Sequence, residues 1–262
     1  MGKVISIFNQ KGGVGKTTTA INLSSYLASM GQKVLLIDID PQGNTTSGLG
    51  IDKDELEYSM YDVIIEYAKQ EKSDIASKAI VKTVIENLYL LPSTVELAGA
   101  EIEMTFNDER EKIFKRAVGE IKDEFDYIFI DCPPSLGLLT INALTGSDSV
   151  LIPIQCEFYA LEGVSQLMNT INLVKKNLNP DIKIQGVVMS MFDGRTNLSI
   201  EVVEEVKKYF KGKVYTTIIP RNIRLAEAPS HGLPIMLYDK NSTGAKSYKE
   251  LAEEFLYLEG DE

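Results

Sequence analysis

Residues 9–19 read NQKGGVGKTTT, and this stretch joins an apolar run, VISIF at residues 4–8, to a helical pattern that begins at Thr17. Three of the four residues 12–15 are glycine, and glycine lets the backbone curl so that successive N–H groups face one anion. The amino end of the following helix directs its positive dipole at the same point. The stretch therefore predicts a phosphate-binding loop between a strand and a helix.

Two side chains at the end of this loop match the chemistry of a bound nucleotide. Lys16 can reach the outer phosphates, and the hydroxyl of Thr17 is placed to ligate Mg²⁺. The residues predicted to contact the nucleotide through this loop are Lys11, Gly12, Gly13, Val14, Gly15, Lys16, Thr17 and Thr18.

Two other interpretations of the glycines fit less well. A dinucleotide-binding fingerprint, G-x-G-x-x-G, would need a third glycine where Thr18 stands, because the helix packs closely on the strand there. A plain glycine turn would leave Lys16 and Thr17 unexplained.

A second site element follows residues 33–38, KVLLID, an apolar run typical of a buried parallel strand. Asp38 and Asp40 come at its carboxyl end, where open α/β sheets bind ligands. We expect Asp40, in preference to Asp38, to hold the Mg²⁺ shell or to orient the attacking water. A turn or helix cap is the alternative for Asp40 and an equal one for Asp38. Pro41 and Gly43 then break regular structure and predict a mobile switch segment.

A third element is the run YIFID at residues 127–131. An apolar strand that ends in aspartate is typical of a Walker B segment, whose carboxylate hydrogen-bonds the Mg²⁺ shell. Such runs are common by themselves, but together with the phosphate loop the signal is specific. The residues predicted at the metal site are Thr17, Asp40 and Asp131.

Apolar runs and helical patterns alternate along the rest of the chain, which is typical of a parallel sheet covered by helices. We predict a single α/β domain of the P-loop fold over residues 1–262, with a mostly parallel, twisted sheet and helices on both faces. Further strands are expected at 87–91, 149–154 and 184–191. Helices are expected at 17–30, 94–103, 108–124, 159–177, 201–211 and 243–258, with one or two surface helices within 52–77.

The composition excludes several classes of protein. No apolar run approaches the roughly 20 residues that a membrane span needs, and no signal-peptide pattern precedes the first strand, so a cytoplasmic location is expected. Cys132 and Cys156, the only cysteines, are too few for a disulfide framework or a zinc site, and we expect both to be buried. The single histidine, His231, is expected to be structural.

The net charge of -11 argues on average against a nucleic-acid partner. One segment departs from this acidity, because no acidic residue occurs between residues 206 and 226, where lysines and arginines accumulate. Two of these lysines are explained as the solvated face of the helix at 201–211. Arginines on loops suit phosphate contacts, because the guanidinium presents a fixed fork of donors. The candidates for contact with the DNA backbone are Arg195, Arg221 and Arg224.

Pro220 and Asn222 follow another predicted strand on the ligand-bearing edge of the sheet. Their backbone and amide groups could read the edge of an adenine base. An ordinary turn is the alternative for these two residues.

Together these motifs resemble the ParA/MinD family of deviant Walker A ATPases, whose loop has the form K-G-G-x-G-K-T and carries an added lysine, Lys11 here. Residues 38–44 (DIDPQGN) are similar to switch I of the ParA branch, and residues 131–135 (DCPPS) are similar to switch II. The resemblance covers essentially the whole chain and is greatest to chromosomal ParA members. Shorter likenesses occur at residues 97–101, 159–163 and 220–231.

This resemblance implies an ATPase that uses ATP and Mg²⁺, forms a homodimer around two ATP molecules and acts in chromosome or plasmid partitioning. It implies that Lys11 crosses to the nucleotide of the second subunit, so that Lys11, Lys16 and Asp40 serve in catalysis. It also implies non-specific DNA binding, a location on the nucleoid, and a ParB-like partner that stimulates release.

Three rivals share parts of the pattern. A MinD-like membrane ATPase has the same loop, but the acidic end EGDE at residues 259–262 lacks the basic amphipathic pattern of a membrane-surface helix. An iron–sulfur reductase resembling the nitrogenase iron protein is disfavoured by the scarcity of cysteines. A metabolite ligase or kinase on the same scaffold stays open and predicts ATP turnover that depends on a metabolite.

Overall fold

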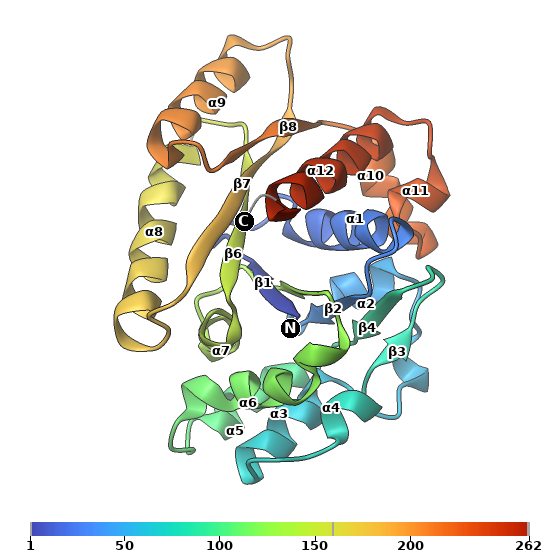
Figure 1. Cartoon of the computed structure of the whole chain (residues 1–262), viewed down its shortest axis with the longest axis vertical. Coiled ribbons are helices and arrows are strands. Elements are labelled where there is room, and N and C mark those ends of the chain that lie inside the picture. Colours follow the sequence, from blue (N-terminus) through green and yellow to red (C-terminus); the bar gives the residue numbers. More distant parts are fainter. Residues whose placement is uncertain (1, 159, 261–262) are drawn as a thin grey trace.

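The computed structural model describes residues 2–158 and 160–260, and these residues build one eight-stranded sheet (Figure 1). The strand order is β3-β4-β2-β5-β1-β6-β7-β8. All neighbouring strands are parallel except the edge pair β3 and β4. The strands are β1 (Lys3–Ile7), β2 (Val34–Asp38), β3 (Val81–Lys82), β4 (Leu88–Leu91), β5 (Tyr127–Asp131), β6 (Ser149–Gln155), β7 (Lys183–Phe192) and β8 (Val214–Pro220).

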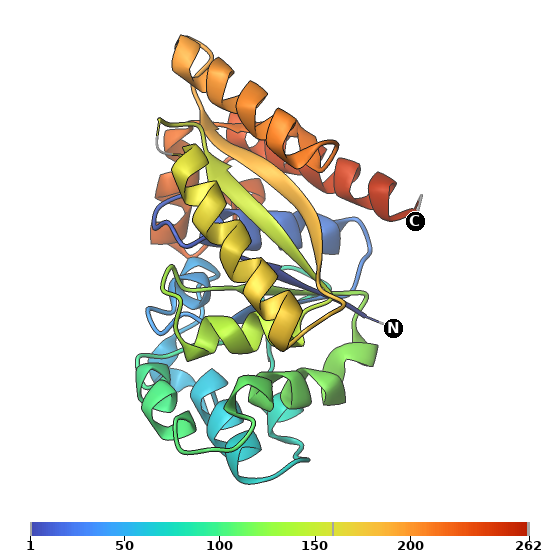
Figure 2. The same cartoon turned by 90° about the vertical axis from the view of Figure 1, so that its left-hand side faces the viewer.

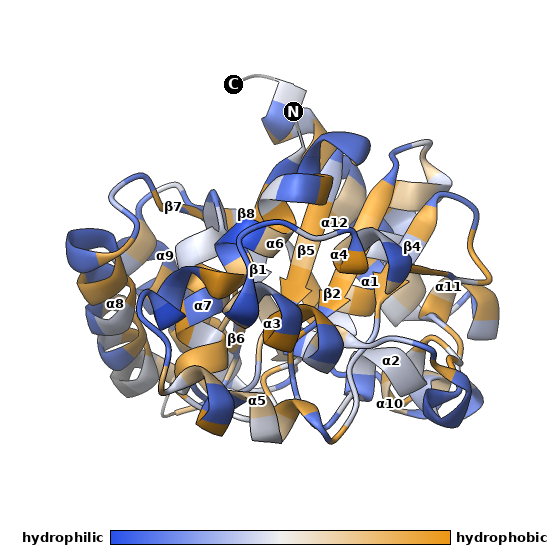
Figure 3. Ribbon diagram, turned by 90° about the horizontal axis from the view of Figure 1, so that it is seen from below, coloured by the Kyte–Doolittle hydropathy of each residue, from blue (hydrophilic) through white to orange (hydrophobic). Residues whose placement is uncertain are grey.

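Two apolar cores lie on the two faces of this sheet, because successive side chains of a strand point to opposite faces. In β5, Ile128 and Ile130 belong to one core and Phe129 belongs to the other, and all three are fully buried. Figure 3 shows apolar strands flanked by helices that mix polar and apolar residues. A strand that is buried on both faces reads as a continuous apolar run, which is why these strands could be predicted.

Helices cover both faces of the sheet, and in Figure 2 α8 lies in front of the strands and α12 behind them. The first core is closed by α3 (Met60–Lys69), α4 (Ile75–Lys78), α5 (Leu97–Met104), α6 (Ile113–Ile121), α7 (Leu138–Gly146), α8 (Ala160–Asn177) and α9 (Asn197–Phe210). The second is closed by α1 (Lys16–Ser29), α2 (Asn44–Gly48), α10 (Ile223–Glu227), α11 (Ile235–Tyr238) and α12 (Thr243–Gly260). Short 3₁₀ turns are η1 (Lys53–Glu55), η2 (Arg110–Lys112), η3 (Lys122–Glu124) and η4 (Ala228–His231).

The predicted α/β fold, with a mostly parallel sheet and helices on both faces, is confirmed. The predicted helix at 159–177 appears as α8, and its first residue, Tyr159, lies outside the described residues.

Some elements differ from expectation. The helix α3, in the stretch expected to hold surface helices, buries Met60, Val63 and Tyr67 in the first core and leaves Lys69 exposed. The helix α7 was not predicted, because it buries polar as well as apolar residues and so shows no clear periodicity. The edge strand β3 is only two residues long, which is too short for an alternating pattern.

The strand order brings the predicted site elements together. Strands β2, β5 and β1 lie side by side, and their register aligns both Asp38 and Ile7 with Asp131. Because the carboxyl ends of parallel strands meet on one edge of the sheet, the phosphate loop after β1 lies next to the two aspartates.

Candidate active site

The loop between β1 and α1 has the backbone curvature that its glycines predict. Gly13 and Gly15 have φ angles of 74° and 90°, in the left-handed region that residues with side chains rarely adopt. Gly15 is also the N-cap of α1, so the amino end of that helix opens onto the loop. The hydroxyl of Ser190 on β7 donates a hydrogen bond to the carbonyl oxygen of Val14 (2.7 Å). The chain itself therefore fixes the loop in a shape that fits phosphate.

The start of the loop is anchored on both sides. The Oδ1 of Asn9 accepts a hydrogen bond from the backbone N–H of Lys11 (3.0 Å), and its Nδ2 donates to the carbonyl oxygen of Pro153 (2.8 Å). Gln10 stands where the common motif has glycine, and its Nε2 donates to the hydroxyl of Thr170 on α8 (2.7 Å). The replacement of glycine by Gln10 therefore adds a contact between the loop and α8.

The two lysines of the loop have different surroundings. Lys16 is buried, and its Nζ donates to the carbonyl oxygen of Lys11 (3.1 Å). Burial lowers the pKa of Lys16, and the nearby charge of Asp131 opposes this shift. The side chain of Lys11 is 38% exposed and forms an ion pair with Glu157, which follows β6. One lysine thus lies inside the loop, and the other lies on its outer surface.

Asp131 joins the loop to the switch segment. Its Oδ2 accepts hydrogen bonds from the hydroxyls of Thr17 (2.8 Å) and Thr45 (2.7 Å). Its Oδ1 is buried and has no hydrogen-bond partner among the described residues. A buried carboxylate oxygen without a donor is costly, and a cation beside it would satisfy it.

A second buried carboxylate, Asp38, lies beside Asp131 on the neighbouring strand. Its Oδ2 accepts hydrogen bonds from the backbone N–H (2.9 Å) and the hydroxyl (2.8 Å) of Thr46. Burial, and secondarily the charge of Asp131, raise the pKa of Asp38 to about 7. Burial also raises the pKa of Asp131 to about 6. Two adjacent carboxylates in a dry site favour a bound cation, which offsets their repulsion.

These residues fit a Mg²⁺ ion. The hydroxyl of Thr17 and the carboxylate of Asp131 are the oxygen ligands that Mg²⁺ prefers. Among the described residues, no three His, Cys, Asp or Glu side chains form a cluster that could hold a metal without other ligands. This agrees with the usual Mg²⁺ site at a nucleotide, where phosphate oxygens and water complete the shell.

Asp40, which we expected at the Mg²⁺ shell or the attacking water, lies in the turn after β2 and is half-buried. Its Oδ1 accepts a hydrogen bond from the backbone N–H of Gln42 (3.0 Å). This is the turn contact that the sequence left as the alternative. The role of Asp40 in hydrolysis stays a prediction.

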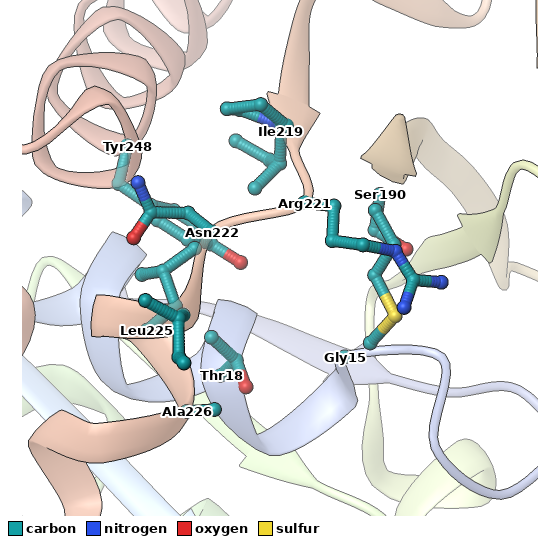
Figure 4. A pocket seen from close by; sticks show the side chains of 12 residues that line it. Gly15, Thr18, Ser190, Ile219, Arg221, Asn222, Leu225, Ala226 and Tyr248 are labelled. Carbon is teal, nitrogen blue, oxygen red and sulfur yellow. The ribbon is translucent and has the colours of Figure 1, made fainter. Parts of the chain in front are cut away.

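Beside the loop lies a pocket of about 420 Å³ with largely apolar walls (Figure 4). Gly15 and Thr18 form its side toward the phosphate loop, while Ile219, Leu225 and Tyr248 are among the residues that line it from β8, α10 and α12. An apolar pocket next to a phosphate loop fits the base of a nucleotide.

Pro220 and Asn222, the residues proposed near adenine, both line this pocket. The Oδ1 of Asn222 caps α10 by accepting from the backbone N–H of Arg224 (2.8 Å), and its Nδ2 donates to the hydroxyl of Thr243 (2.6 Å). These two contacts leave one N–H of the Asn222 amide, together with the backbone, for a contact with adenine.

The three arginines proposed for DNA binding lie in different surroundings. Arg221 lines the base pocket (Figure 4). Arg195 is on a loop, with a side chain that is 88% exposed and paired with Asp193 (2.6 Å). Arg224 lies on the helix α10 and not on a loop, so that expectation was wrong; it pairs with Glu227 (2.8 Å).

The basic segment does not fold into one continuous patch. Lys213 precedes β8 and Arg221 follows it, and seven residues of extended strand lie between them, about 23 Å at roughly 3.3 Å per residue. Charges that are close in sequence therefore lie at opposite edges of the sheet. The fold also places acidic residues from outside the basic segment next to its arginines, and Asp239 forms an ion pair with Arg224 in this way (3.5 Å).

Sequence reasoning missed two residues of the site. Thr45 directly follows the switch motif that ends at Asn44, and a hydroxyl at that place was a usable signal for a contact with the site. Ser190 lies near the end of the apolar strand β7, and nothing in its local pattern distinguishes it from a core position.

The predicted burial of the two cysteines is confirmed. Cys132 and Cys156 are both buried, and burial raises the pKa of each thiol to about 12. His231 stacks on Tyr238 with ring centroids 4.9 Å apart, which is a structural contact.

The fold and the site define a P-loop nucleotide-binding protein, with a phosphate loop after β1 and an aspartate at the end of the adjacent β5. A family model described as an AAA domain matches residues 2–184. Over 254 residues the chain is 61% identical to the sporulation initiation inhibitor protein Soj of Bacillus subtilis, which covers 97% of this chain and 98% of that one. It is 51% identical over 256 residues to the chromosome partitioning protein ParA of Myxococcus xanthus, covering 98% and 88%. The chain therefore belongs to the ParA/MinD family of deviant Walker A ATPases.

A solved structure agrees with this assignment. The cobyrinic acid a,c-diamide synthase from Mycobacterium smegmatis, with bound ATP analogue and magnesium, matches with a TM-score of 0.84 and 37% identity over 99% of this chain and 96% of that chain. The resemblance to the ParA/MinD family and the prediction of an ATPase are confirmed.

Proposed function

We propose that the protein is a chromosome- or plasmid-partitioning ATPase that forms a homodimer around two ATP molecules. The dimer binds DNA without sequence preference and leaves it when a ParB-like partner stimulates hydrolysis. The similarity to Soj of Bacillus subtilis and to ParA of Myxococcus xanthus over nearly the whole chain supports this role. In this role the protein would be cytoplasmic and associated with the nucleoid.

The observation that supports the dimer is that one lysine of the loop is buried and the other is partly exposed. Lys16 is buried within the loop, where it can neutralise the outer phosphates of its own nucleotide. Lys11 lies on the outer surface, held only by an ion pair with Glu157 that is about one third exposed on each side. A partly exposed lysine beside a phosphate site is available to a second nucleotide that is brought against it.

ATP and Mg²⁺ are the nucleotide and the metal of this site. The backbone N–H groups of residues 12–18 would hold the phosphates, and Thr17 and Asp131 would hold the metal, with Asp40 in its shell or at the attacking water. Bound Mg²⁺ would neutralise charge on the phosphate oxygens. Catalysis then rests on Lys11, Lys16 and Asp40, which position charge and water around the outer phosphate.

For DNA we propose contacts through Arg195, Arg221 and Arg224. The ion pairs of Arg195 and Arg224 are exposed and screened by solvent, so the acids beside these two arginines leave the guanidinium groups available to phosphate. A dimer would present two copies of each arginine, which raises affinity through multivalency. DNA affinity would thereby depend on ATP occupancy.

A membrane-associated role is less well supported. No helix of the described residues is long and apolar enough to cross a membrane. The helix α12 buries Tyr248, Leu251 and Phe255 in the second core, so this apolar face is not available to a lipid surface. Sedimentation with anionic vesicles would test the alternative.

A metabolite ligase is favoured by one observation, the similarity to cobyrinic acid a,c-diamide synthase. That identity is 37%, against 61% for Soj of Bacillus subtilis. The ligase alternative predicts ATP turnover that needs a carboxylic acid substrate and is indifferent to DNA.

The deciding experiment measures the ATPase rate alone, with DNA, with a ParB-like protein, and with both. We expect a low basal rate that DNA and the ParB-like protein raise together. A rate that neither of them changes would contradict the proposed function.

A further inference from the structure

A second cavity, of about 530 Å³, lies at the amino ends of β1, β6 and β7. Because these strands are parallel, this is the edge of the sheet opposite the phosphate loop. Its size is within the range of small-molecule sites, about 300–1,000 Å³. It shares no residue with the nucleotide pocket, so the nucleotide site does not account for it.

Lysines from separate parts of the chain converge on this cavity. Two acidic side chains, Asp148 and Asp181, also line it. With Lys3 set aside because it pairs with Glu259, four lysines against two aspartates leave an excess of two positive charges, in a chain whose net charge is -11. The lysines are Lys3 at the start of β1, Lys115 on α6, Lys122 in η3, Lys183 at the start of β7 and Lys213 before β8.

The ion pairs of the molecule do not explain this convergence. Lys3 is paired with Glu259 (2.7 Å), but the other four lysines form no ion pair among the described residues. Asp148 is partly engaged, since its Oδ2 accepts from the backbone N–H of Val4 (2.8 Å). Like charges gathered without partners repel one another, and a bound anion would remove that repulsion.

The floor of the cavity is polar and is already hydrogen-bonded within the protein. Thr145, Ser147, Ser149 and Asn179 line it with buried side chains. The hydroxyl of Ser149 donates to Gln185 Oε1 (2.8 Å), and Asn179 Nδ2 donates to the carbonyl oxygen of Ser147 (2.7 Å). With these donors engaged, the recognition of negative charge falls to the lysines.

The chemistry of the lining points to phosphate. The lysine ammonium is a flexible point charge that commonly binds phosphate groups, and it is the only cationic group among the described residues that line this cavity. A cavity of about 530 Å³ is of the size that takes a small molecule, which favours a small phosphorylated ligand over a DNA duplex. We propose that this cavity is a second anion site, which binds a small phosphorylated molecule through Lys115, Lys122, Lys183 and Lys213. This site does not depend on the proposed partitioning role.

The test uses inorganic pyrophosphate as the probe, titrated by calorimetry into the full chain with excess ADP on the phosphate loop. A fluorescent ADP analogue reports any displacement from the loop. The variant Lys115→Ala/Lys183→Ala removes two exposed lysines that form no ion pair, so the fold should persist. The matched control, Lys69→Ala/Lys82→Ala, removes the same charge on α3 and β3, away from the cavity.

We expect one pyrophosphate per chain in the wild type, at least tenfold weaker binding in the cavity variant, and unchanged binding in the control. Equal pyrophosphate affinity in all three proteins would overturn the proposal. An equal loss of affinity in both variants would also overturn it, because binding would then depend on the overall charge of the protein and not on the cavity. If the cavity variant proves unstable by thermal unfolding, Lys213→Ala replaces it with the same expected direction. A duplex of 20 base pairs is titrated in parallel; loss of duplex binding with pyrophosphate binding retained would make the lysines a nucleic-acid surface and overturn the small-molecule site.

Discussion

The phosphate loop and the basic segment, which comprises Arg195 and the acid-free stretch between residues 206 and 226, differ in how they are held. Residues from outside the loop hold it in place: Ser190 donates to the backbone carbonyl of Val14, and Thr170 accepts from the side chain of Gln10. The arginines of the basic segment are half-exposed or more and are tied mainly to neighbours within three residues, as Arg195 is to Asp193. A change in the loop should therefore have a large and specific effect, while a change in the basic segment should have a small and graded one.

The largest effect is expected for Lys16→Ala. This substitution removes a buried charge that would contact the outer phosphates, and charge-assisted hydrogen bonds are worth about 1.5–3 kcal/mol each. Loss of two such contacts should weaken ATP binding on the order of a thousandfold, measured by calorimetry. Lys11→Ala is the matched control in the same loop and should keep its ATP affinity. Unchanged affinity in Lys16→Ala would mean that the loop does not bind phosphate.

Asp40→Ala should leave ATP binding largely intact and reduce hydrolysis by a factor of about 10²–10⁴, the usual contribution of a positioned acid or base. Single-turnover measurements with labelled ATP would separate the two steps. Asp54→Ala, at an exposed aspartate of the next turn, is the control and should hydrolyse normally. Normal turnover of Asp40→Ala would leave Asp40 with only its turn contact to Gln42.

The same contrast explains what could be predicted from the sequence. The phosphate loop could be predicted from local sequence, because its conformation follows from glycines at fixed spacing. Strands that are buried on both faces could be predicted because they are continuous apolar runs. The placement of Asp131 and of the aspartates after β2 at one end of the sheet followed from one topological rule about parallel strands. The register aligns Asp38 with Asp131, whereas we had preferred Asp40. These parts of the fold and site needed no knowledge of distant contacts.

The parts that could not be predicted depend on contacts between distant segments. Ser190 reaches the loop only because β7 lies two strands from β1. One of the acidic residues that pair with Arg224, Asp239, lies outside the basic segment. The lysine cavity at the opposite edge joins residues from position 3 to position 213, and no linear pattern marks it.

The outer lysine of the loop gives an effect of intermediate size. Lys11→Ala should keep ATP binding but lose the ATP-dependent dimer, because its charge is proposed to act across the interface. Glu157→Gln removes the present partner of Lys11 and should form the dimer at the same or lower protein concentration. Sedimentation in ATP, in the hydrolysis-blocked Asp40→Ala background, measures both. A dimer of unchanged strength in Lys11→Ala would show that this lysine is dispensable.

The smallest effects are expected at the basic segment, where the net charge of -11 opposes DNA binding. Arg195→Glu and Arg224→Glu should each weaken DNA binding by roughly five- to tenfold, or about 1 kcal/mol, and should do so equally on unrelated DNA sequences, since phosphate contacts carry no sequence information. The effect is modest because each arginine is exposed and its charge is screened by solvent, and because it must give up an ion pair to contact phosphate.

The salt dependence makes this last prediction specific. Each lost phosphate contact should shallow the slope of log affinity against log salt by roughly 0.9, while ATP affinity and dimer formation stay unchanged. Lys207→Glu is the matched reversal, on the solvated face of α9, and should leave both the affinity and the slope near the wild-type values. Equal losses of DNA affinity in all three variants would mean that the arginines act only through the overall charge of the protein and not through specific phosphate contacts. Equal DNA affinity of the wild type in ATP, the wild type in ADP and both arginine variants would contradict DNA binding itself, because a dimer-dependent switch requires the ATP state to bind more tightly.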